Sequence, residues 1–231
     1  MTDPVVDGSA APEWLAPLVR RSADVDQGHF GWPRLRPPRS ARPAAVLILF
    51  GEDADGPDVL LLRRADGLSS HPGQVAFPGG SIDPSDAGPV AAALREAQEE
   101  VGAPPAGVRP LALLPELHVP HSGFRVTPVV AHWRDPSPVA PVDLGETRAV
   151  ARVPLSWLVD PANRLRVRLR DGRAGPAFVV PGMLVWGFTG VLLAGVLELG
   201  GWSSGWDDAP ELDLDEAWRA AESAADVGFG G

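Results

Sequence analysis

Three carboxylates stand within five positions in the segment Arg95-Glu96-Ala97-Gln98-Glu99-Glu100-Val101-Gly102. An α-helix advances by about 100° per residue, so Glu96, Glu99 and Glu100 would fall within an arc of about 100°. The apolar residues around them fall on the opposite side: Val90, Leu94, Ala97 and Val101. The pattern therefore predicts a helix that packs one face on a sheet and projects three carboxylates from the other.

This helix is expected to run from about Pro89 to Val101. Proline suits the first helical position, Asp86 or Gly88 can cap the start, and Gly102 can end the helix. A Glu-rich helix taken alone is most often a solvated face. The residues that precede the helix indicate whether its carboxylates also bind a metal.

The preceding segment, Phe77-Pro78-Gly79-Gly80, favours a metal site. It lies between a predicted strand and the helix, where glycines allow close backbone approach and coordination through a carbonyl. Glu96 and Glu100 are like charges one turn apart, which costs roughly a few tenths of a kcal/mol that a bound cation would remove. Because all these ligands are oxygens, the pattern predicts a site for Mg²⁺ or Mn²⁺.

Periodicity along the rest of the chain predicts an α/β fold. Strands are expected at residues 44–50, 59–63, 74–77, 108–114, 124–132, 147–153, 165–169 and 177–180. Further helices are expected near residues 12–21, 182–199 and 212–225. Mixed strands with few helices on their faces are typical of an α/β sandwich.

We divide the chain into three parts: an N-terminal arm (1–42), a central domain (43–200) and an acidic, Trp-containing C-terminal tail (201–231). The tail is expected to dock its tryptophans on the domain and expose its acidic side chains to solvent. A tail that binds a partner protein is the alternative.

The composition excludes several classes of protein. The net charge of −10 argues against binding nucleic acid by phosphate neutralisation, and the absence of cysteine excludes disulfides and thiol nucleophiles. The N-terminus lacks the basic and apolar regions of a signal peptide. The uncharged run at residues 183–197 is shorter than the roughly 20 residues of a membrane span, so it predicts a buried helix. We expect a cytoplasmic protein with no membrane partner.

The carboxylate segment resembles the Nudix box, G-x5-E-x7-R-E-U-x-E-E-x-G-U, where U is apolar. Gly80, Arg95-Glu96, Glu99-Glu100 and Gly102 match it. Two features depart from the pattern, because Asp86 stands where Glu is expected and the step from Gly80 to Arg95 is one residue longer. The resemblance implies an α/β/α sandwich with a mixed β-sheet and a divalent-metal-dependent hydrolase of nucleoside diphosphate derivatives.

An upstream segment resembles the coenzyme A pyrophosphatase branch, L-L-T-x-R-[SA]-x3-R-x3-G-x3-F-P-G-G. Its matches are Leu60, Leu61, Arg64, Ala65, Gly73 and Phe77-Pro78-Gly79-Gly80. Leu62 stands where Thr is expected, and Ser69 stands where the second Arg is expected. Residues 126–130 and 186–189 also resemble later segments of that branch, so the resemblance spans roughly residues 44–200.

The resemblance implies hydrolysis of the pyrophosphate bond of coenzyme A or acyl-CoA, giving (acyl-)4′-phosphopantetheine and adenosine 3′,5′-bisphosphate. Glu96, Glu99, Glu100 and the Gly79 carbonyl would hold Mg²⁺ or Mn²⁺, and Arg95 would orient the carboxylates. Glu96 or Glu99 would act as the general base on the attacking water. The residues expected to contact the nucleotide substrate are Arg64, Ser69, His71, Gln74, His118 and His121.

Several alternatives stay open at this point. The substrate could be another dinucleotide, such as ADP-ribose or NADH, since Ser69 removes an expected bidentate phosphate donor. The chain could also be a non-catalytic Nudix-fold domain that binds a ligand. His118 and His121 lie in the predicted loop 117–123, where they could contact phosphate or simply face solvent. A homodimer is also left open.

Overall fold

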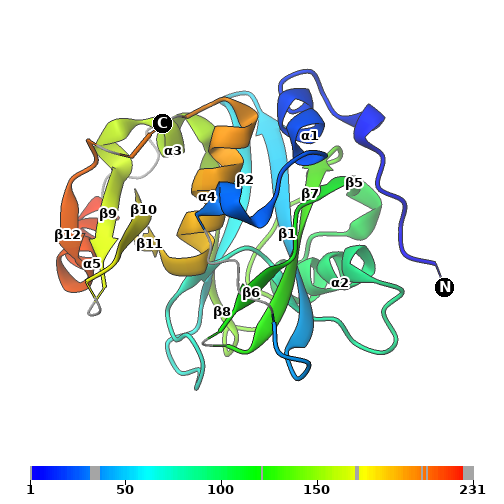
Figure 1. The fold of residues 1–231 in the computed structure, drawn as a ribbon, viewed down its shortest axis with the longest axis horizontal. Coiled ribbons are helices and arrows are strands. Elements are labelled where there is room, and N and C mark those ends of the chain that lie inside the picture. Colours follow the sequence, from blue (N-terminus) through cyan, green and yellow to red (C-terminus); the bar gives the residue numbers. More distant parts are fainter. Residues whose placement is uncertain are drawn as a thin grey trace.

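A computed structural model describes residues 2–31, 37–120, 122–169, 172–203, 205–206 and 208–225. In this part of the chain, the main sheet has eight strands in the order β3-β2-β1-β7-β5, with β4 beside β1, β6 beside β7 and β8 beside β2 (Figure 1). The strands are β1 (Arg42–Asp53), β2 (Gly56–Arg64), β3 (Val75–Ala76), β4 (Gly79–Ser81), β5 (Val108–Leu113), β6 (Leu117–Val119), β7 (Phe124–Trp133) and β8 (Thr147–Pro154).

The sheet is mixed because β1 and β7 run parallel while the other pairs are antiparallel. β1 is apolar on both faces, as expected of a central strand with helices on either side. Leu47 and Leu49 face one core and Ile48 and Phe50 face the other, all with no solvent exposure. The alternation places one helical layer on each side of the sheet.

Helix α2 (Pro89–Val101) covers one face through Val90, Ala93, Leu94, Ala97 and Val101. It ends at Gly102, which has a left-handed φ of 74°. Its start is capped from far away in sequence, since Asp3 accepts hydrogen bonds from the Val90 and Ala91 backbone N–H groups at 3.3 and 2.8 Å. The N-terminal stretch runs along the side of the molecule past β5 to reach it (Figure 1).

The opposite face is covered by α1 (Ala16–Ser22) and α4 (Gly187–Gly200). Helix α4 is apolar on nearly all sides because it also packs against a second sheet. This arrangement confirms the predicted α/β/α sandwich with a mixed sheet. Leu15 and Leu18, before residue 42, have no solvent exposure and belong to the same core. The boundaries at residues 42 and 200 stay predictions.

The second sheet has the order β11-β10-β9-β12; its strands β9 and β10 correspond to the predicted strands 165–169 and 177–180, but their arrangement in a separate sheet was not predicted. Phe178 and Val180 of β10 face α4, whereas Ala177 and Val179 face α5 on the outer side. The elements are β9 (Arg164–Arg168), β10 (Ala174–Val180), β11 (Met183–Val185), β12 (Glu211–Asp213) and α5 (Leu214–Ala224). The remaining helices are α3 (Leu155–Val159), η1 (Gly8–Ala10), η2 (Gln27–Phe30), η3 (Pro105–Gly107) and η4 (Pro161–Asn163).

Three predicted helices begin later than expected: the helix near residues 12–21 begins at Ala16, and the other two begin after short strands. The helix predicted from residue 182 begins at Gly187, because Met183–Val185 pairs with β10 as β11. The helix predicted from residue 212 begins at Leu214, because Glu211–Asp213 pairs with β9 as β12. The last two corrections involve three-residue strands, of which β11 forms a tight hairpin with β10 and β12 pairs with β9 much earlier in the chain. Within the described ranges, none of the helices is both long enough and apolar enough to span a membrane.

Candidate active site

Arg95 is the centre of a charged cluster on the exposed side of α2. Its guanidinium binds Asp86 in a bidentate manner, with Nε at 3.1 Å from one carboxylate oxygen and Nη2 at 3.0 Å from the other. Nη1 donates to Glu96 and Glu99, both at 2.9 Å, and Nη2 donates to the Ser81 carbonyl at 3.1 Å. Arg95 therefore fixes two of the carboxylates relative to β4.

Asp86 makes this contact despite both departures from the motif. The longer step to Arg95 is accommodated in the turn before α2, where the Asp83 N–H donates to Asp86 at 2.8 Å. The hydrogen bonds from Arg95 hold the pKa of the Asp86 carboxyl below its usual value. An aspartate at this position thus pairs with the arginine directly.

Glu96 lies directly over Gly80. A Cβ added at Gly80 would come within 2.5 Å of a Glu96 carboxylate oxygen, so glycine is required for this close approach. The Glu96 side chain is only 17% exposed. Burial raises the pKa of Glu96, while the neighbouring Arg95 charge lowers it and Glu99 raises it.

Glu100 contacts the neighbouring glycine, Gly79. Its carboxylate accepts a hydrogen bond from the Gly79 backbone N–H at 2.9 Å. Burial raises the pKa of Glu100 to about 7, against the opposing effect of the Gly79 N–H, and the Glu96 charge raises it further. Glu99 differs from both, because its side chain is 59% exposed.

The carboxylates are placed as predicted, on one face of α2 beside Gly79 and Gly80. Among the residues that the structure describes, no three His, Asp or Glu side chains converge as a metal-binding group in this conformation. The contacts explain why, since Arg95 holds Glu96 and Glu99 while the Gly79 N–H holds Glu100. Side-chain rotation of these carboxylates would be needed to share one cation.

Four of the expected substrate residues lie in and beside the turn between β2 and β3. Arg64 ends β2, and its charge lowers the pKa of Glu100. Ser69 and His71 are exposed in the turn, and His71 Nδ1 lies 2.9 Å from the Gln74 side-chain oxygen. Arg64 thus links this turn to the α2 cluster through its electrostatic effect on Glu100.

The two histidines of the predicted loop 117–123 have different outcomes. His118 lies in β6 and pairs with Arg125 of β7, so the loop prediction was wrong for this residue. Leu117, the residue before it, is fully buried, and its burial favours the pairing of this segment with β7. β1 and β7 separate β6 from β4. His121 lies outside the described residues.

Glu146 is a site residue that the sequence did not indicate. It precedes β8, and its carbonyl accepts from the Ala65 N–H at 2.8 Å beside the β2–β3 turn. Its side chain is exposed, and its charge is the smallest of the effects that raise the pKa of Glu100. Glu146 belongs to no motif, so only the fold brings it here.

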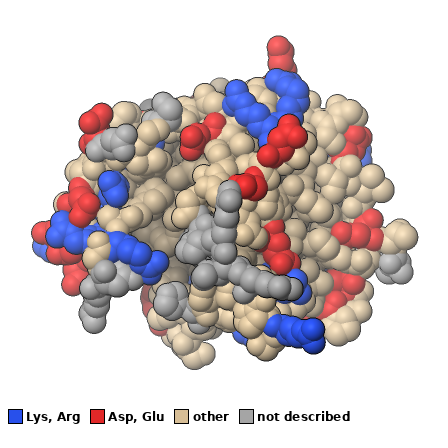
Figure 2. Space-filling model, viewed as in Figure 1, with Lys and Arg blue, Asp and Glu red and all other residues tan. Residues whose placement is uncertain are grey.

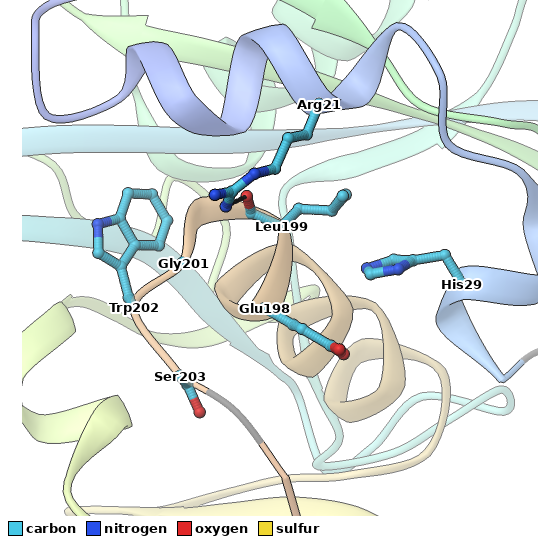
Figure 3. A pocket seen from close by; sticks show the side chains of 7 residues that line it. All are labelled: Arg21, His29, Glu198, Leu199, Gly201, Trp202 and Ser203. Atoms are coloured by element: carbon cyan, nitrogen blue, oxygen red, sulfur yellow. Dashed lines mark hydrogen bonds between the residues drawn. The ribbon is translucent and has the colours of Figure 1, made fainter.

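A pocket of about 480 Å³ lies elsewhere, beside the C-terminal end of α4 (Figure 3). Arg21 donates to the Leu199 carbonyl at 2.6 Å, and His29 Nε2 lies 3.0 Å from the Gly195 carbonyl. These contacts attach the N-terminal segment to α4 and satisfy carbonyls at the helix end. Because α4 and α2 cover opposite faces of the main sheet, this pocket is separate from the carboxylate cluster.

On the face seen in Figure 2, arginine and acidic side chains are interspersed over the described residues. Nucleic-acid-binding surfaces usually gather basic residues on one face or along one helix. The charges seen here have no such arrangement.

The raised pKa of Glu100 predicts how stability depends on pH. Its ordinary value is 4.5 and its value in the fold is about 7, so between these pH values the folded protein holds a proton that the unfolded chain has released. The free energy of unfolding of the metal-free protein should therefore fall as pH rises through this window, by at most about 3 kcal/mol.

Urea denaturation in EDTA between pH 4.5 and 8 measures this effect. Glu100→Gln is neutral at every pH and should flatten the slope relative to the wild type. Equal slopes in the two proteins would show that Glu100 is not the group responsible.

Comparison with known proteins identifies the family. The family model described as NUDIX domain matches residues 40–173. The uncharacterised Nudix hydrolase NudL of Enterobacter sp. strain 638 is 46% identical over 121 residues, which are 50% of this chain and 58% of that protein. NudL of Pectobacterium atrosepticum is 51% identical over 98 residues, which are 42% of this chain and 50% of that protein. The chain thus spans about half the length of these curated relatives.

Solved structures match a similar share of the chain. An Ap4A hydrolase binary complex from C. elegans has 21% identity and a TM-score of 0.41, covering 51% of this chain and 83% of that one. The Nudix hydrolase RenU from M. smegmatis has 26% identity and a TM-score of 0.41, covering 52% and 74%. Because the family model matches more than half of the 231 residues, the chain belongs to the Nudix hydrolase family.

Proposed function

We propose that this protein hydrolyses the pyrophosphate bond of coenzyme A or acyl-CoA in a reaction that depends on Mg²⁺ or Mn²⁺. The products would be (acyl-)4′-phosphopantetheine and adenosine 3′,5′-bisphosphate. The observation that carries the proposal is the α2 carboxylate cluster, in which Arg95 holds Glu96 and Glu99, Glu96 lies over Gly80 and the Gly79 N–H holds Glu100. The segment from Leu60 to Gly80, which resembles the coenzyme A branch, ends at the two glycines that contact Glu96 and Glu100.

The chemistry of the site fits a hard divalent cation. Glu96, Glu99, Glu100 and the Gly79 carbonyl offer only oxygen donors, which Mg²⁺ and Mn²⁺ prefer. Burial raises the pKa of both Glu96 and Glu100 despite the Arg95 and Gly79 N–H partners, and a bound cation would offset this cost of burying charge. When bound, the cation would neutralise phosphate charge and favour the attack of water on phosphorus.

The general base in this proposal is Glu99, with Glu96 as the alternative. Glu99 is the most exposed of the three carboxylates and is oriented by a single hydrogen bond from Arg95. The water oxygen forms a bond to phosphorus, the bridging P–O bond breaks, and the water proton passes to the Glu99 carboxylate. Arg95 positions the carboxylates and does not contact the substrate.

Arg64 is proposed to bind the substrate phosphates, together with Ser69, His71 and Gln74. The Arg64 Nε atom is buried and has no hydrogen-bond partner among the described residues, so a guanidinium donor is available beside the carboxylate cluster. Guanidinium groups are well suited to phosphate. Phosphate contacts by His118 and His121, a homodimer and a cytoplasmic location stay predictions.

Product analysis with a small substrate panel tests the proposal. Coenzyme A, acetyl-CoA, ADP-ribose and NADH are incubated with Mg²⁺ or Mn²⁺, with EDTA as the control, and the products are separated by mass. Adenosine 3′,5′-bisphosphate from the two CoA compounds is the expected result. AMP from ADP-ribose or NADH alone would overturn the substrate assignment, and no product from any compound would favour a ligand-binding domain.

A further inference from the structure

The turn between β2 and β3, residues 65–74, is held closed by Arg63. The Arg63 guanidinium donates to Asp66 at 2.8 Å and to the Gly73 carbonyl at 3.4 Å, so one side chain joins the start of the turn to its end. The backbone adds the Arg64 N–H to Gln74 carbonyl bond at 2.9 Å and the Gly73 N–H to Ala65 carbonyl bond at 3.4 Å. This turn carries the exposed Ser69 and His71.

The closed turn stores backbone strain at its tip. Among the described residues, His71 is the one non-glycine residue with a positive φ, at 54°. Residues other than glycine hold this conformation only where their surroundings fix it, and they concentrate at functional sites. His71 is exposed, so core packing does not hold its backbone in this conformation. The contact with Gln74 and the closure of the turn by Arg63 must therefore do so.

Arg63 in turn is covered by Trp218 of α5. Its guanidinium carbon lies 5.9 Å from the centre of the Trp218 ring, within the range of a cation–π contact. Helix α5 is firmly placed by a capping box between Asp213 and Glu216 and by the pairing of β12 with β9. β11 of the same sheet also contacts β3. The second sheet and α5 therefore position Trp218 beside Arg63.

We propose that Trp218 is a positioning residue for substrate binding, acting through Arg63 to hold residues 65–74 in the binding conformation. The inference rests on the proposed function in that this turn is taken to contact the substrate phosphates. It assigns a role to the C-terminal segment, which lies outside residues 40–173 of the family match. Trp218 itself does not touch the reacting atoms.

The test compares Trp218→Leu, Trp218→Phe, Arg63→Met and a double variant that combines Trp218→Leu with Arg63→Met. Leucine keeps apolar packing but removes the aromatic face, whereas phenylalanine keeps the face. Trp218→Leu and Arg63→Met should each raise KM about 3- to 5-fold with kcat nearly unchanged, and Trp218→Phe should restore most of the loss. The double variant should be no worse than Arg63→Met alone, because Trp218 acts through Arg63 and has no effect once Arg63 is replaced.

Hydrogen exchange gives a second readout that does not need turnover. Backbone amides of residues 66–73 should exchange several-fold faster in Trp218→Leu and Arg63→Met, while amides within α5 keep their wild-type rates. Unchanged KM together with unchanged exchange in Trp218→Leu, or additive effects in the double variant, would overturn the inference. A wild type that cleaves no panel compound would contradict the proposed function instead, and the exchange rates would still decide the role of Trp218.

Discussion

Glu99→Gln is expected to lower kcat about 10³-fold while leaving the thermal midpoint close to that of the wild type. Its side chain is 59% exposed, and it takes part in one hydrogen bond, from Arg95 at 2.9 Å, which an amide oxygen can still accept. The substitution therefore removes a proton acceptor and a charge from the site with little change in packing. Steady-state kinetics with saturating Mg²⁺ and thermal unfolding measure the two effects.

Glu13→Gln is the matched control for this prediction. Glu13 is exposed and precedes α1, on the opposite face of the sheet from α2, so the same chemical change should leave kcat unaltered. Undiminished turnover in Glu99→Gln would remove Glu99 from the reaction and leave Glu96 as the candidate base. A large fall in the thermal midpoint would show that the Arg95 contact is structural.

Gly79→Ala is expected to destabilise the fold by about 3 kcal/mol or more. An added Cβ would lie 2.3 Å from the Ala45 carbonyl oxygen and 2.7 Å from the Val46 Cα. Both are backbone atoms of the central strand β1, which cannot move without disturbing the sheet. β4 would have to separate from β1, and the site would lose the Gly79 N–H that holds Glu100.

Gly80→Ala separates stability from activity at the neighbouring position. There the added Cβ meets the Glu96 carboxylate, which is the movable end of a side chain. We expect a much smaller loss of stability than in Gly79→Ala but a large loss of activity, because Glu96 is displaced. Urea denaturation and kcat measured on both variants check this contrast. A Gly79→Ala protein as stable as the wild type would contradict the close packing of β4 on β1.

The elements with strong local patterns could be predicted from the sequence. Helix α2 runs from Pro89 to Val101 as expected, because its apolar stripe, its initial proline and its final glycine all agree. The central strand β1 was recognisable because its apolar run is buried on both faces. The clustering of three carboxylates on one helix face also follows directly from helical periodicity.

The second sheet could be predicted only in part, since β9 and β10 match the strands expected at residues 165–169 and 177–180 but the two shortest strands leave no signal in the sequence. β11 and β12 have three residues each, too few to show a period, and β12 pairs with β9 across more than forty residues of chain. The same limit applies to the site. Asp3 caps α2, and the charge of Glu146 acts on Glu100, only because the fold brings these residues there, and neither lies in a recognisable motif.

The most direct test of the central claim measures coenzyme A hydrolysis by the wild type and Glu99→Gln side by side, with Mg²⁺ and with EDTA. Mass analysis follows the release of adenosine 3′,5′-bisphosphate over time. We predict product from the wild type with Mg²⁺, none with EDTA, and about 10³-fold less from Glu99→Gln. Equal product from both proteins, or product that persists in EDTA, would contradict a metal-dependent reaction at the α2 carboxylates.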